Sequence, residues 1–221
     1  QAGVATAFST FNYRWDKLDP CSSARSRVTV SFYDGSDPGG SNVWNGAMIT
    51  EMANDDYFMY QYDVSSPEAK KYGSAAEYVK AKLGELSGKG IAVTDVYFFD
   101  HGTIAGQGGM SLGDDWYMNG GEGDESLSSF AQMLGGVLPV DATIHLRGCW
   151  GGRIAQVVAD ASGLRTTGWT GMVIFVDQKD EPDYSAGRDY RGEGTYVIST
   201  PGAKDPQTKT EYEGNYDPNH Y

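Results

Sequence analysis

Two stretches of the sequence decide the fold: VTDVYFFDHG at residues 93–102 and TIHLRGCWGG at residues 143–152. Each is rich in β-branched and aromatic residues and stops at a glycine, which is typical of a buried parallel strand that runs into a loop. The first stretch brings His101 to its end and the second brings Cys149. Parallel strands open their carboxyl ends to one shared crevice, where ligands bind in open α/β sheets. We therefore expect the imidazole and the thiol to meet there as a nucleophile–base pair.

Strands and helices alternate along the rest of the chain. Besides the strand before Cys149, the expected strands are 27–33, 57–64, 91–99, 169–176 and 194–200, and the expected helices are 43–54, 66–86, 126–138 and 153–161. This alternation predicts a three-layer α/β fold, with a mostly parallel sheet and helices on both faces. The last two strands also fit an antiparallel hairpin at one edge of the sheet.

The length and composition of the chain fit one domain. With 221 residues, 39% of them hydrophobic, the chain can bury a sizeable core, and we place a single domain at residues 27–200. Residues 1–26 are predicted to form an N-terminal arm, and residues 201–221 a polar tail that is extended or loose. The start at Gln1 fits a removed leader, an excised piece, or a precursor cut by another peptidase or by the protein itself.

The glycine-rich residues 102–123 are predicted to form a long loop that gates the crevice. Five acidic residues crowd this loop and its end: Asp114, Asp115, Glu122, Asp124 and Glu125. Because hard cations bind several oxygen ligands, a calcium site is one reading of them. EF-hand spacing is absent, and a solvated acidic loop is the simpler reading, so no metal or other cofactor is expected.

Charge limits the partners that the protein can have. The net charge is −13, and binding to nucleic acid or to anionic lipid needs clustered Lys and Arg. No apolar run approaches the ~20 residues that span a bilayer, so no membrane insertion is expected. With only Cys21 and Cys149, the chain is not predicted to be a disulfide scaffold. The expected partner is therefore a protein or peptide substrate.

The segments His101-Gly102, Ser111-Leu112-Gly113 and Leu146-Arg147-Gly148-Cys149 resemble the caspase-like clan of cysteine peptidases. His101 and Cys149 are 48 residues apart, close to the ~50 of caspases. The resemblance spans roughly residues 90–176 and is nearest to bacterial caspase-like domains of unknown function. One departure concerns residues 150–152, where Trp-Gly-Gly follows the cysteine and caspases have Arg-Gly.

The resemblance implies roles for several residues. Cys149 would be the nucleophile, His101 the general acid–base, and the amides of Gly102 and Cys149 the oxyanion hole. Arg147 would line the pocket for the residue before the cleaved bond, where it favours an acidic side chain. Asp34 and Asp37 lie in the loop after the first strand, and this loop also contributes to that pocket in relatives. They would favour a basic side chain, or simply pair with Arg147.

Other residues near the cysteine have competing readings. Trp150 fits a pocket wall or the core equally well. His145 lies four residues before Cys149 on the same strand, about 13 Å away at ~3.3 Å per residue, so we expect it to be structural. The helix that follows Cys149 would favour a thiolate through its dipole.

Taken with the resemblance, these residues predict a cysteine endopeptidase that cleaves protein substrates or its own precursor. Two alternatives stay open. One is a non-catalytic binding or scaffold module of a larger bacterial surface or effector protein. The other is a thiol-dependent acyltransferase on the same fold.

Overall fold

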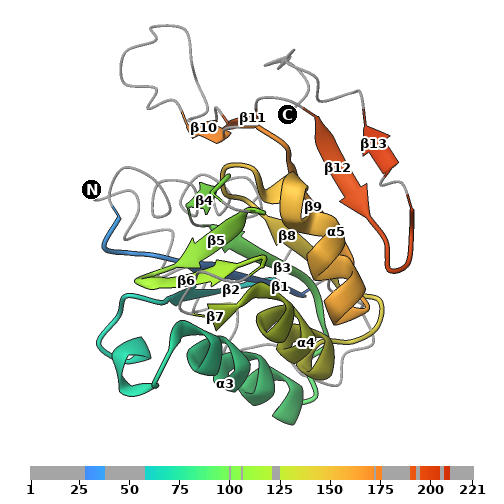
Figure 1. Ribbon diagram of the computed structural model, residues 1–221. Helices are drawn as coiled ribbons and strands as arrows, with labels where there is room; N and C mark the ends of the chain where they lie inside the picture. The colour runs from blue at the N-terminus through green and yellow to red at the C-terminus, as the bar shows by residue number, and fades with distance from the viewer. Residues whose placement is uncertain are drawn as a thin grey trace, which may run out of the picture.

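The computed structural model describes residues 28–37, 58–99, 101–105, 107–120, 125–171, 173–175, 190–192, 195–204 and 207–209. Its centre is a seven-stranded sheet in the order β13-β12-β9-β8-β3-β1-β2 (Figure 1). The strands are β1 (Val28–Tyr33), β2 (Phe58–Asp63), β3 (Val93–Phe99), β8 (Thr143–Leu146), β9 (Arg165–Trp169), β12 (Tyr196–Ser199) and β13 (Gln207–Lys209). From β2 to β9 all neighbours are parallel, whereas β12 and β13 are antiparallel. The predicted α/β class and its antiparallel edge are confirmed.

The described α-helices pack on one face of this sheet. They are α3 (Ala75–Gly88), α4 (Leu127–Val137) and α5 (Gly151–Ser162). α4 contacts both α3 and α5, and the three follow one another along the sheet in Figure 1. The helix expected at 43–54 and the arm at 1–26 lie outside the described residues. No helix of the described part is long and apolar enough to cross a membrane.

The core between sheet and helices follows the two-residue period of the strands. Every second side chain of the central strands faces the helices and is buried: Val30, Phe32, Val96, Phe98, Ile144 and Leu146. The helices supply Leu83, Leu86, Phe130, Leu134, Ile154 and Val158 to the same cluster. Each such side chain contributes about 1.5–3 kcal/mol on burial.

The opposite face of the sheet carries polar and aromatic side chains. Thr29, Ser31 and Thr167 are buried there, and Asp95 and His145 lie on the same face by strand alternation. The apolar–polar alternation of β1, β3 and β8 therefore separates a hydrophobic core from a polar, largely buried layer.

The segment predicted as a gating loop at 102–123 is a small sheet, so that prediction is wrong for its described residues. The sheet has the order β4-β5-β6-β7, with β4 (Gly102–Thr103), β5 (Gly109–Leu112), β6 (Asp115–Met118) and β7 (Glu125–Ser126). β5 and β6 form a hairpin around Gly113 and Asp114, with Gly113 at φ 62°. A glycine at the first position of a two-residue turn is the signal for such a hairpin. Its buried side chains belong to the core: Met110, Leu112 and Tyr117.

The helix expected to start at Ser66 begins later. Ser66 Oγ accepts from the Ala69 amide at the start of the short 3₁₀ turn Ala69–Lys71. This turn ends at Tyr72, which is extended with ψ 148°. Ser74 then caps α3 by accepting from the Glu77 amide. By contrast, Ser126 caps α4 as predicted.

The strand expected at 169–176 is split in two. β9 already starts at Arg165 and ends at Trp169, and β10 (Val173–Phe175) pairs with β11 (Tyr190–Gly192) in a separate sheet. The Thr-Thr-Gly run in β9 hides its strand character, because it lacks an apolar period. Part of the segment predicted as a polar tail forms β13 on the outer edge of the main sheet.

Candidate functional site

The strand order places three loops at one edge of the sheet. β1 lies between β2 and β3, so the chain leaves β1 in one direction and returns past it to form β3. Such a reversal is where open α/β sheets bind ligands, outside the carboxyl ends of the strands. Residues 34–37 follow β1, His101 follows β3, and Cys149 follows β8. Three of the predicted site segments therefore share this edge.

Gly102 and Cys149 are in direct backbone contact. A Cβ atom at position 102 would collide with the carbonyl oxygen of Cys149, so only glycine fits this approach. Both residues also line one small cavity, with a volume of about 10 Å³, beside Phe98 and Leu146. That is room for about one water molecule. The structure thus brings the segment that carries His101 against the turn that carries Cys149.

Cys149 sits in a sharp turn between β8 and α5. The turn is closed by a hydrogen bond from the Gly151 amide to the Gly148 carbonyl, at 3.3 Å. Trp150 has the left-handed conformation, with φ 58° and ψ 14°, and is the only non-glycine residue with positive φ in the described chain. Such strain costs about 1–3 kcal/mol and is typical of functional turns.

Glycines let α5 lie close to the sheet behind this turn. A Cβ atom at Gly152 would be 2.8 Å from the Gly168 carbonyl oxygen, and one at Gly151 would be 2.8 Å from Leu146 Cβ. Cys149 is half-buried and lies two residues before the start of α5.

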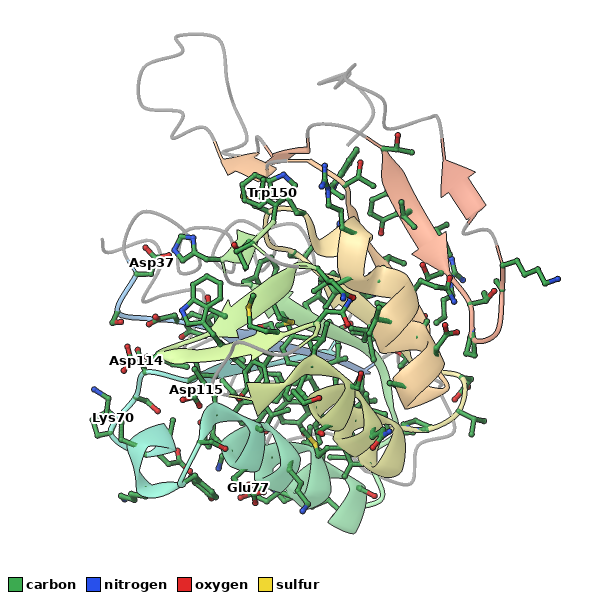
Figure 2. All side chains as sticks on the ribbon, in the orientation of Figure 1. Asp37, Lys70, Glu77, Asp114, Asp115 and Trp150 are labelled. Atoms are coloured by element: carbon green, nitrogen blue, oxygen red, sulfur yellow. The ribbon has the colours of Figure 1, made fainter. Side chains whose placement is uncertain are left out.

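The His101 side chain is exposed on one side and contacts a carboxylate on the other. Its Nε2 lies 3.1 Å from Asp37 Oδ2, and the exposed fractions of the two side chains are 58% and 22%. The backbone of His101 is fixed as well, because its carbonyl accepts from the Ser111 amide at 2.8 Å. In Figure 2 Asp37 lies at the left of the view and Trp150 near the top, both above Lys70 and Glu77.

Arg147 lies over aromatic rings. Its guanidinium is 5.4 Å from the centre of the Tyr97 ring and 5.6 Å from that of Tyr196. Strand alternation does not place the side chains of Arg147 and Cys149 on one face. The strand ends at Leu146, and residues 148–150 form a turn, so alternation no longer applies there.

Asp34 has a local role in its own turn. Its Oδ1 accepts from the Ser36 amide at 2.8 Å and from the Ser36 hydroxyl at 2.6 Å. These bonds are typical of an Asx turn. They hold the backbone that carries Asp37, whose amide donates to the Asp34 carbonyl at 3.2 Å.

His145 is the centre of a buried polar row across β3, β8 and β9. Its Nε2 is 2.9 Å from Asp95 Oδ1, and its Nδ1 is 2.9 Å from Thr167 Oγ1. Burial lowers the pKa of His145 to about 4, although the hydrogen bond to Asp95 opposes this shift. The neutral ring must then donate from Nε2 to the carboxylate and accept the threonine hydroxyl at Nδ1. The ring also stacks on Tyr97, with centroids 4.1 Å apart.

One of the acids considered for calcium has another role. Asp115 Oδ2 accepts from the Ala75 amide at 2.6 Å and so caps α3 from the neighbouring hairpin. Glu122 and Asp124 lie outside the described residues. Among the residues that the structure describes, no group of three or more His, Cys, Asp and Glu side chains is placed to hold a metal ion.

Sequence reasoning missed two features of the site. It placed Asp37 in a substrate pocket and did not connect it with His101, because the pairing joins loops 64 residues apart. It also gave no role to Asp63 at the end of β2, which bonds to the turn after β1. A carboxylate at the end of each of two neighbouring parallel strands was the available signal.

Comparisons with family models, with curated proteins and with solved structures found no match for this chain.

Proposed function

We propose that this protein is a cysteine endopeptidase of the caspase-like kind, with Cys149 as nucleophile and His101 as general acid–base. The observation that carries the proposal is the backbone contact between Gly102 and Cys149 at the carboxyl edge of β3 and β8. It puts the residue after the histidine against the cysteine itself. A thiol and an imidazole delivered to one crevice are the pair that nucleophilic catalysis needs.

The chemistry follows from these groups. The thiol proton passes to His101, and the thiolate of Cys149 attacks the carbonyl carbon of the scissile peptide. The resulting oxyanion would be held by the amides of Gly102 and Cys149. As the C–N bond breaks, His101 returns its proton to the leaving amine, which leaves a thioester on Cys149. His101 then takes a proton from water, whose oxygen attacks the thioester. As the C–S bond breaks, His101 returns this proton to the sulfur, which frees the acid and the thiol.

Two features beside the thiol support this mechanism. Cys149 lies in the turn that leads into α5, two residues before the helix starts. In the described part of the chain, the cavity of about 10 Å³ beside Cys149 has room for about one water molecule. We infer that a substrate lies along the crevice, as a polypeptide does.

The test combines cleavage and labelling. The wild-type protein is incubated with a peptide library, beside Cys149→Ala and His101→Ala, and its thiols are labelled with iodoacetamide. We expect peptide cleavage by the wild type alone, with losses of at least ~10³-fold in both variants. Cys149 should label fast and Cys21 slowly.

Each alternative predicts a different result. Acyl transfer to added amines without hydrolysis would identify a transferase. Equal, slow labelling of both thiols with no cleavage would favour a binding module and end the peptidase proposal.

A further inference from the structure

The residue that contacts the imidazole of His101 is itself held in place. Asp37 Oδ2 lies 3.1 Å from His101 Nε2, and the aspartate is the less exposed partner, at 22% against 58%. Its backbone belongs to the turn that Asp34 and Ser36 close. A carboxylate fixed in this way can hold an exposed imidazole in one orientation.

The turn that carries Asp37 is anchored to the next strand through Asp63. Asp63 Oδ1 accepts from the Gly35 amide at 2.9 Å, the Ser65 amide at 2.8 Å and the Ser65 hydroxyl at 2.6 Å. The Ser65 hydroxyl in turn accepts from the Ser36 amide at 3.0 Å. At Gly35 any side chain would collide with the Asp63 carboxylate. The ends of β2, β1 and β3 are therefore linked in the order Asp63, turn, Asp37, His101.

We propose that Asp37 is the positioning residue of His101, so that the site is a Cys149–His101–Asp37 triad and not a dyad. This inference rests on the proposed function of Cys149 and His101. Asp37 accepts a hydrogen bond from Nε2–H, and Nδ1 exchanges a proton with the Cys149 thiol. When the thiol proton moves to Nδ1, the imidazolium keeps its Nε2–H···carboxylate bond, and Asp37 stays ionised.

The charges make this arrangement chemically productive. Proton transfer turns a neutral thiol–imidazole pair into a thiolate and an imidazolium, and a carboxylate on the far nitrogen stabilises the cation. Asp37 then acts on the thiol through His101 and has no need to touch the substrate. If Asp37 instead formed part of a pocket for a basic side chain, its removal would change the affinity for substrate and leave the reactivity of the Cys149 thiol unchanged.

Thiol reactivity separates these roles without a known substrate. In a Cys21→Ser background, the rate constant for alkylation of Cys149 by iodoacetamide near neutral pH is measured for the parent and for four variants: His101→Ala, Asp37→Asn, Asp37→Glu and Asp141→Asn. The last removes the same charge from an exposed residue before the start of β8 and serves as the matched control. Circular dichroism and thermal unfolding of each variant identify any that fail to fold.

We expect Asp37→Asn to slow alkylation about tenfold, as the loss of a charge-assisted hydrogen bond predicts. Asp37→Glu should recover part of the rate, and Asp141→Asn should stay near the parent rate. If His101→Ala slows alkylation but folded Asp37→Asn matches the parent, the triad is overturned and the dyad stands. If folded Asp141→Asn slows alkylation as much as Asp37→Asn, the effect follows from the net charge of the protein, which also overturns the triad. If folded His101→Ala has no effect, the proposed function itself fails.

Discussion

His101 and His145 differ in what surrounds the ring. The His101 side chain is 58% exposed and meets one carboxylate, whereas that of His145 is 12% exposed and bonds to Asp95 and Thr167 on the strands to either side. A histidine with two fixed partners and a pKa lowered to about 4 has no spare nitrogen and little basicity for catalysis near neutral pH. Sequence spacing alone already separated the two, because His145 lies within a strand and His101 just beyond one.

The lowered pKa of His145 predicts a loss of stability in acid. The unfolded chain binds a proton at His145 below pH ~6.5, but the native state does so only near pH 4. Stability from this residue is therefore greatest above the unfolded pKa, falls between the two values, and levels off below the folded one. We expect a loss of about 2 kcal/mol between pH ~7 and ~5. Urea unfolding of the wild type and of His145→Gln measures it, and equal pH slopes for the two proteins would contradict it.

At the scale of elements, helices with a capping residue and a regular apolar stripe could be predicted from the sequence. Short glycine-rich strands could not. α4 begins after Ser126 as predicted, because its cap and apolar stripe are local signals. β5 and β6 have only four residues each and derive their stability from long-range burial of Leu112 and Tyr117. Local propensity cannot report that burial. The Gly113-Asp114 pair between two apolar runs was the one local sign of the hairpin.

Because α5 lies close to β9, a Gly→Ala substitution in α5 should lower the stability of the protein, whereas one at an open position of α3 should raise it. At Gly152 a methyl group would be 2.8 Å from the backbone of residues 168 and 169, so Gly152→Ala must push the helix away. We expect a destabilisation of about 1–3 kcal/mol, as in overpacked cores, and slower alkylation of Cys149. Gly84 in α3 has nothing within 4 Å, so Gly84→Ala should stabilise by about 0.5–1 kcal/mol through helix propensity alone. Chemical unfolding of both variants checks the pair, and a neutral Gly152→Ala would show that α5 can shift without cost.

At the scale of the whole molecule, the sheet order could be only partly derived from the sequence. Alternating elements predicted a mostly parallel sheet, and parallel strands predicted that His101 and Cys149 share an edge. The position of β1 between β2 and β3 is a property of the assembled sheet, because no local pattern states which strands become neighbours. That position brings the turn after β1 beside His101. The contact between Asp37 and His101 therefore could not be predicted without knowing the order of the strands in the sheet.

The net charge of −13 acts on stability in the direction opposite to His145. As the pH falls from ~7 to ~5 the protein loses negative charge, so self-repulsion in the compact state weakens and the fold gains stability. Salt screens this term, since the screening length falls from about 30 Å at 0.01 M to about 3 Å at 1 M. The His145 term arises from burial and persists in salt. We therefore expect the wild type to lose more stability between pH ~7 and ~5 at ~1 M NaCl than at ~0.01 M NaCl, where charge relief offsets part of the ~2 kcal/mol.

Urea unfolding at both pH values and both salt concentrations measures the two terms together, and His145→Gln isolates the charge term. In that variant the same acidification should stabilise the protein at low salt and have little effect at high salt. An identical pH dependence of the wild type at both salt concentrations would show that self-repulsion is negligible despite the charge. If His145→Gln still loses the full ~2 kcal/mol between pH ~7 and ~5 at high salt, a group other than His145 causes the loss of stability. Asp95, the partner of His145, would then be the first residue to replace, by Asn. If both effects have the expected signs, the free energy of unfolding near pH 5 depends on ionic strength through repulsion between surface charges. It depends on pH through the protonation of the buried His145 ring.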